Sequence, residues 1–129
     1  MRKKKFLKKV QEYAELDHLD QAEDLTRVVF YLLSARLTIN EGEDLRAQLS
    51  GDLKELWDGV KETKVDVIKF NKPEFLNRII ADVGLESVEE AERVVNAVFK
   101  ALKSQISAGE AEDVAAQLPK GLKEMWIES

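Results

Sequence analysis

The chain contains one helical pattern twice, and this internal repeat limits its fold more than any other feature of the sequence. Residues 6–57 align with residues 75–126 without a gap, and about a third of the roughly 52 paired positions are identical. Such self-similarity is typical of a duplicated supersecondary unit. The identical pairs include Phe6 with Phe75, Leu16 with Leu85, Ala22 with Ala91, Phe30 with Phe99, Glu41 with Glu110, Asp44 with Asp113, Gln48 with Gln117, and Trp57 with Trp126.

The second copy carries the clearer helix boundaries. Proline favours a first helical turn, glycine favours a helix end, and Ser-x-x-Glu has the spacing of a capping box. These signals predict four helices, and the longest of them has an apolar stripe along one face. The boundary residues are Pro73, Gly84, Ser87 with Glu90, Ser107 with Glu110, and Pro119.

The first copy repeats this plan with weaker boundaries. We expect helices over about residues 3–15 and 20–37, a short one after Asn40 and another after Ser50. The predicted fold is all-α, with two pseudo-symmetric four-helix repeats packed into one bundle-like domain. The repeats are predicted to be residues 1–59 and 73–129, with Phe30, Phe99, Trp57 and Trp126 at the centre of a shared core.

Residues 60–72 are interpreted as a linker between the repeats. Val65, Val67 and Ile68 have spacing and β-branching that would suit a short extended segment. A single strand would have no partner here, so an ordered linker or a continuation of the preceding helix is favoured. The sequence leaves the choice between extended and helical structure open.

The composition excludes several classes of site. Apolar residues make up 44% of the chain and charged residues 35%, which is typical of a folded protein. No cysteine is present, so disulfides, thiolate metal ligands and a cysteine nucleophile are excluded. The single histidine, His18, is expected at the surface. No phosphate-binding loop, nucleophile elbow or metal-spaced His set occurs. We therefore predict no cofactor, metal ligand or catalytic residue, and the sequence leans against an enzyme.

The charge and hydropathy indicate a cytoplasmic protein. No apolar run approaches the roughly 18 residues that span a bilayer, and the N-terminal residues lack the apolar segment of a signal peptide. The formal net charge of −5 argues against bulk nucleic-acid binding, because phosphate backbones are bound largely through clustered Lys and Arg.

A cluster of cations at the N-terminus is the least expected feature. Cations at the start of a helix oppose its dipole, so fold stability does not explain them. Three interpretations compete: a docking strip for an acidic partner or a second copy of the chain, a weak tether to an anionic surface, and a solvated end that aids solubility. The predicted partner-binding residues are Arg2, Lys3, Lys4, Lys5, Lys8 and Lys9.

Acidic residues shared by both copies form a second candidate group. The favoured interpretation is structural, with Glu43 and Glu112 as capping carboxylates in a first helical turn. The alternative is a metal or small-ligand site, because carboxylate oxygens bind hard divalent cations. Two shared amides, Gln48 and Gln117, are expected to satisfy backbone groups of the turn that follows each short helix.

The second copy also carries a family resemblance. The run Gly109-Glu110-x-Glu112-Asp113-x-x-Ala116-Gln117-Leu118-Pro119, followed by Leu122 and Trp126, resembles the bacterial family DUF2267, a domain of unknown function. The first copy departs from it at Asn40 and Ser50, which stand in place of Gly109 and Pro119. The resemblance implies a small all-helical prokaryotic protein with no assigned activity.

The hypothesis from these observations is a non-catalytic protein-interaction or scaffolding module. Its basic N-terminus and acidic second copy are the expected contact surfaces, and self-association is one form of this hypothesis. The alternative is a small-ligand or metal-dependent enzyme that uses Glu43, Asp44, Glu112 and Asp113.

Overall fold

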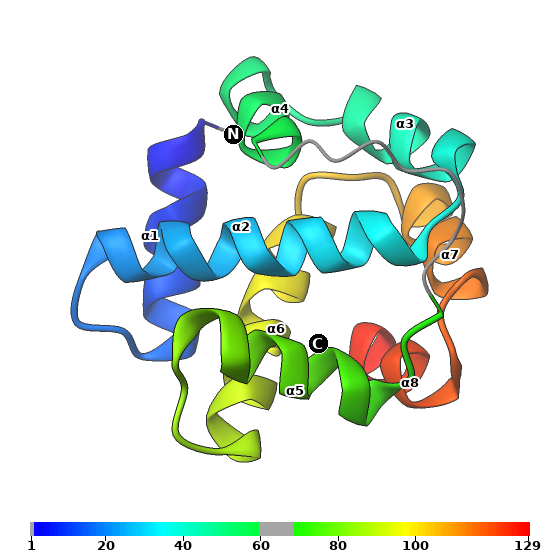
Figure 1. Ribbon diagram of the computed structural model, residues 1–129. Coiled ribbons are helices and arrows are strands. Elements are labelled where there is room, and N and C mark those ends of the chain that lie inside the picture. The colour runs from blue at the N-terminus through cyan, green and yellow to red at the C-terminus, as the bar shows by residue number, and fades with distance from the viewer. Residues whose placement is uncertain (1, 60–68) are drawn as a thin grey trace.

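The computed structural model describes residues 2–59 and 69–129, and all regular structure in these residues is helical. The prediction of an all-α fold is confirmed. The first half contains α1 (Lys3–Ala14), α2 (Leu19–Arg36), α3 (Ile39–Ala47) and α4 (Gly51–Asp58) (Figure 1). The second half contains α5 (Lys72–Val83), α6 (Val88–Lys103), α7 (Ala108–Ala116) and α8 (Lys120–Glu128). Most of the predicted linker, residues 60–68, lies outside the described residues.

Each end of α5 shows why its sequence forms a helix there. The Asn71 side chain accepts a hydrogen bond from Glu74 N at 2.9 Å, and Asn71 N donates to Glu74 Oε1 at 3.2 Å. This is a complete capping box. At the other end Gly84 has φ of +72°, a left-handed conformation that glycine adopts without steric cost. The equivalent residue after α1 is Glu15, with φ of +56°.

The start of α3 differs from the prediction. Thr38 precedes the helix, and its Oγ1 accepts from Glu41 N at 3.2 Å, as Ser107 Oγ accepts from Glu110 N at 3.1 Å before α7. Asn40, which was expected to precede α3, lies inside its first turn. The threonine hydroxyl is the stronger determinant because it satisfies a backbone N–H that Asn40 would leave free.

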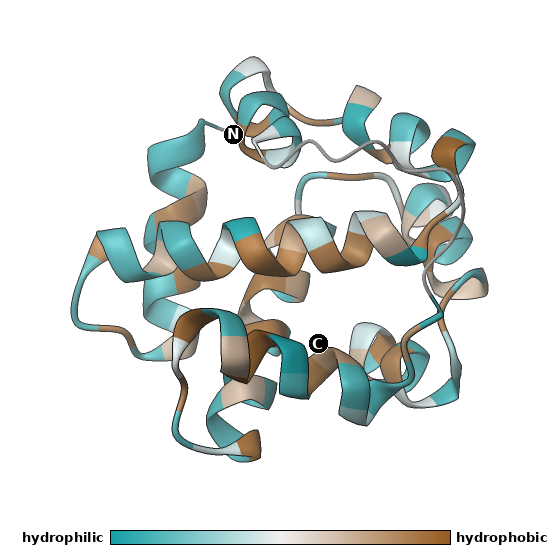
Figure 2. Ribbon diagram, in the orientation of Figure 1, coloured by the Kyte–Doolittle hydropathy of each residue, from teal (hydrophilic) through white to brown (hydrophobic). Residues whose placement is uncertain are grey.

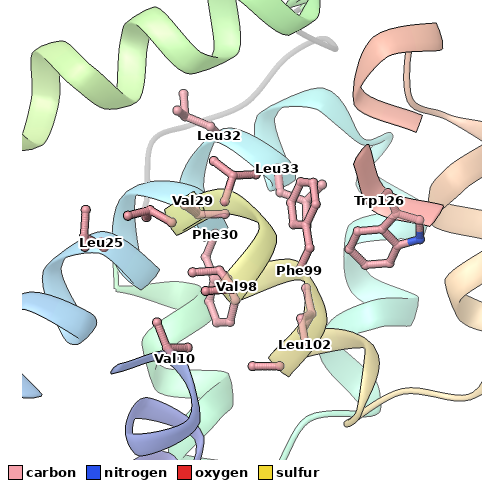
Figure 3. Close-up of a cluster of buried hydrophobic side chains, with 14 of the residues drawn as sticks. Val10, Leu25, Val29, Phe30, Leu32, Leu33, Val98, Phe99, Leu102 and Trp126 are labelled. Atoms are coloured by element: carbon pink, nitrogen blue, oxygen red, sulfur yellow. The ribbon is translucent and has the colours of Figure 1, made fainter. Parts of the chain in front are cut away.

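The two long helices, α2 and α6, supply the centre of one hydrophobic core. Their apolar faces bury Phe30 and Phe99 completely, together with leucine and valine neighbours (Figure 3). Residues from all eight helices belong to this cluster. The hydrophilic residues lie mostly on the outward faces of the helices (Figure 2). Burial of apolar surface therefore stabilises both halves through the same core.

Helices of one half pack closely on helices of the other. The most extensive helix contact joins α1 to α6, and α2 likewise packs on α5. Arg93 of α6 donates to the Ala14 carbonyl oxygen at 3.1 Å, and the Lys100 ammonium lies 4.2 Å from the Tyr13 ring centroid. These two contacts hold α1 against α6 at the edge of the helix–helix interface, while apolar side chains fill the interior of that interface.

The two halves make equivalent aromatic contacts. The ring centroids of Phe6 and Phe30 are 5.8 Å apart, and those of Phe75 and Phe99 are 6.3 Å apart. Trp57 and Trp126 extend these chains, at 5.3 Å from Phe30 and 5.0 Å from Phe99. The correspondence supports the interpretation as a duplicated unit, which stays a prediction, as do the proposed repeat boundaries.

The length and polarity of the helices determine whether any of them could span a bilayer. Within residues 2–59 and 69–129, every helix is too short or too polar to cross a membrane.

Candidate functional site: the α3–α7 carboxylate cluster

The short helices α3 and α7 lie side by side at one end of the molecule (Figure 1). Their starts are joined by two reciprocal sets of hydrogen bonds. Thr38 N donates to Gln117 Oε1 at 2.8 Å, and Ser107 N donates to Gln48 Oε1 at 2.7 Å. Each glutamine amide also donates to the hydroxyl of the same capping residue, at 3.3 Å and 3.5 Å respectively.

The glutamines therefore have a different role from the predicted one. We expected each to satisfy the turn that follows its own helix, but each instead caps the helix of the opposite half. In an ordinary capping box, the glutamate three residues into the helix would accept from the capping residue's N–H. Here Gln117 and Gln48 take those bonds, and the carboxylates of Glu41 and Glu110 are free to turn elsewhere.

Glu41 and Glu110 turn toward each other between the two helices. Each is only 6% exposed, which is unusual for a carboxylate. Glu41 Oε1 and Glu110 Oε1 are buried without a hydrogen-bond partner in the described part of the chain. Two buried carboxyl groups that face each other cannot both ionise without a large electrostatic cost.

Two aspartates extend this pair toward solvent. Asp113 is exposed, and its carboxylate oxygen lies with those of Glu41 and Glu110 in a group in which all oxygens are within 4.8 Å of one another. Asp44, also exposed, is near enough for its charge to act on both glutamates. Each aspartate follows its glutamate by three residues, which places the two side chains on one helix face. We call these four residues the carboxylate cluster.

The cluster changes the acidity of both glutamates. Burial raises the pKa of Glu41 to about 7, and the nearby charges of Glu110 and Asp113 act in the same direction. Burial also raises the pKa of Glu110, and the nearby charges of Asp113 and Asp44 act in the same direction. Both carboxyl groups are therefore harder to ionise than an exposed glutamate.

The structure divides the acidic residues that were considered for the alternative metal-dependent enzyme. Asp44 and Asp113 belong to the carboxylate cluster, whereas Glu43 and Glu112 do not. Glu43 lines a separate groove with Arg46, and Glu112 lines one beside Trp126. Both glutamates are exposed and neither is the N-cap's partner. Their expected capping role is therefore wrong, because each lies two residues after the position that receives the cap.

Sequence reasoning missed the pairing of Glu41 with Glu110. A signal was present in the sequence, since the alignment of residues 6–57 with residues 75–126 already places Glu41 opposite Glu110. The period of the helix also separates Glu41 and Asp44 from Glu43, which points to a different face.

The basic N-terminal residues divide into a structural member and exposed ones. Lys3 forms an ion pair with Glu23 of α2, and its backbone N–H donates to Asp52 Oδ2 at 2.9 Å. Asp52 thus supplies from α4 the acidic cap that the first turn of α1 lacks. Lys9 is half-buried, and the exposed cations of this N-terminal group are Arg2, Lys4, Lys5 and Lys8. We call these four residues the cationic strip.

The remaining residues of interest have structural positions. Trp126 is buried as predicted, and its Nε1 donates to the Ala111 carbonyl oxygen at 3.0 Å. Trp57 is only half-buried, although its ring packs on Phe30. His18 is exposed as predicted and immediately precedes α2. Its backbone N–H donates to Gln21 Oε1 at 3.0 Å.

Comparison with known families agrees with the resemblance in the sequence. A family model described as an uncharacterized conserved protein, DUF2267, matches residues 3–128. The chain belongs to the DUF2267 family. No curated protein matches the sequence. The DUF2267 match spans the eight helices of the described residues, so the carboxylate cluster and Lys4, Lys5 and Lys8 of the cationic strip lie within the family domain.

Proposed function

We propose that the protein is a non-catalytic interaction module that docks an acidic protein partner through the cationic strip. The observation that carries the proposal is the exposure of Arg2, Lys4, Lys5 and Lys8 at the start of one helix. In the described part of the chain, none of these four side chains forms an ion pair. Clustered, unneutralised cations attract an acidic surface and speed its association.

The position of the cationic strip supports this proposal. Cations in a first helical turn are unfavourable by some tenths of a kcal/mol each. Among the described residues, Lys3 has an ion pair that offsets this cost, whereas the cationic strip has none. The opposite face of α1 is buried in the core through Phe6, Leu7 and Val10. The helix therefore presents the exposed lysines from a fixed support. A cytoplasmic location is part of the same proposal.

A cross-linking pull-down from host lysate tests the proposal. The bait carrying Lys4→Glu, Lys5→Glu and Lys8→Glu should lose an acidic protein that the unaltered chain captures in stoichiometric amounts. The control carries Lys69→Glu, Lys120→Glu and Lys123→Glu, which change the net charge equally at exposed positions elsewhere. Capture should survive in this control and weaken with added salt.

Two results would contradict the proposal. One is capture of the same protein by the Lys4, Lys5 and Lys8 variant, and the other is equal loss in the control, which would indicate an effect of net charge alone. Sedimentation of the same three proteins separates self-association, because the second half of the chain has more acidic than basic residues and could itself be the acidic partner.

A further inference from the structure

We propose that Glu41, Glu110 and Asp113 form a binding site for a hard divalent cation of the size of Ca²⁺. The site is independent of the cationic strip and of any docking partner. Its three carboxylate oxygens lie within 4.8 Å of one another. Calcium–oxygen distances are about 2.3–2.6 Å, so ligands on opposite sides of the ion are separated by roughly 5 Å. The three oxygens therefore lie close enough together to bind one ion.

The buried oxygens provide a second, independent argument for a ligand. Glu41 Oε1 and Glu110 Oε1 are both inaccessible to solvent and both lack a hydrogen-bond partner among the described residues. Buried polar atoms in folded proteins are generally satisfied, so an exception calls for an unseen partner. A cation between the two carboxylates would satisfy both atoms and offset their mutual repulsion.

Positive charge from the protein does not already fill this role. None of the ion pairs among residues 2–59 and 69–129 involves a residue of the carboxylate cluster. The neighbouring charges that act most strongly on Glu41 and Glu110 in the described part of the chain are those of other carboxylates. The cluster is therefore a concentration of negative charge without a described counter-ion.

The chemistry of the ligands selects the class of cation. Oxygen-only sets of carboxylates favour Ca²⁺, Mg²⁺ or Mn²⁺ over softer metals, which prefer imidazole or thiolate ligands. Asp113 and Asp44 are exposed, so an ion can reach the glutamates from solvent and keep water molecules in its remaining positions. Ca²⁺ tolerates such irregular coordination better than Mg²⁺, which requires a near-ideal octahedron.

Calorimetric titration of CaCl₂ into chelator-treated protein at pH 8 tests the site. The unaltered chain should bind one ion, and saturating Ca²⁺ should raise the Tm because the ion binds only the folded state. Glu110→Gln should abolish binding. Asp113→Asn changes only an exposed residue and should weaken binding by about tenfold or more, even if the buried substitution disturbs the fold.

The matched control is Glu112→Gln, which removes the same charge from α7 next to Asp113 but outside the cluster. Its affinity for Ca²⁺ should stay within about twofold of the original. The proposal is overturned if millimolar Ca²⁺ gives neither binding heat nor a shift in Tm. It is equally overturned if Glu112→Gln weakens binding as much as Asp113→Asn.

Discussion

At the scale of single residues, Glu15 is held in an unusual backbone conformation. It is the sole non-glycine residue with positive φ in the described part of the chain. The equivalent position in the second half is occupied by Gly84, around which a β-carbon would meet no atom within 4 Å. Both residues end a helix in the same way, since the following N–H groups of Leu16 and Leu85 return to Gln11 O and Ile80 O.

This comparison predicts that Glu15→Gly stabilises the protein. The left-handed conformation costs an L-residue roughly 1–2 kcal/mol, and glycine avoids this cost. Part of the gain is cancelled because glycine gives the unfolded chain more conformational entropy. We expect the free energy of unfolding in urea to rise by about 0.5–1 kcal/mol. Gly84→Ala should lower it by about 1 kcal/mol, because only the backbone conformation opposes the new methyl group there. A fall in the free energy of unfolding for Glu15→Gly, or a rise for Gly84→Ala, would contradict this account.

At the scale of helices, the reciprocal capping of α3 and α7 predicts that Gln117→Ala is destabilising. The substitution leaves Thr38 N without the acceptor 2.8 Å away and also removes the amide that reaches Thr38 Oγ1. Loss of a helix cap costs about 1 kcal/mol, within a range of about 0.5–2 kcal/mol. Urea denaturation measures the change, and Lys123→Ala on the exposed surface serves as the control. A change below about 0.3 kcal/mol would show that water replaces the amide at no cost.

The same helices show how far sequence reasoning reaches. The helix bounds could be predicted to within a few residues, because apolar periodicity and caps such as Ser87 and Gly84 act locally. The cap of α3 by Gln117 could not, since donor and acceptor lie 79 residues apart and meet only after the halves have packed. The carboxylate cluster could be predicted only in part, because it too depends on contacts between distant segments of the chain. Residue types indicated carboxylate chemistry, but only tertiary packing brings Glu41 to Glu110.

For the molecule as a whole, the raised pKa of Glu41 predicts how stability depends on pH. The pKa rises from 4.5 to about 7 on folding, so between these values the folded chain binds more protons than the unfolded chain. Stability from this group is complete below pH 4.5 and is lost as the pH rises through 7, by about 3 kcal/mol. Glu23 acts oppositely, because its lowered pKa makes its contribution disappear at acid pH.

Urea denaturation between pH 5 and pH 8 in the presence of a chelator measures this dependence. The unaltered chain should be less stable at pH 8 than at pH 5. Glu41→Gln should remove most of the decrease, whereas Glu43→Gln, an exposed glutamate on the same helix, should retain it. A decrease of the same size in Glu41→Gln would assign the effect to other groups.

The packing of α1 on α6 also has a consequence for synthesis on the ribosome. The apolar face of α1, with Phe6 and Val10, is translated well before its most extensive partner, which begins at Val88. Chains grow at about 5–20 residues per second, so this face waits several seconds for its partner to be made. During that interval the nascent chain exposes the apolar face of α1, flanked by lysines, to chaperones and to neighbouring polysomes.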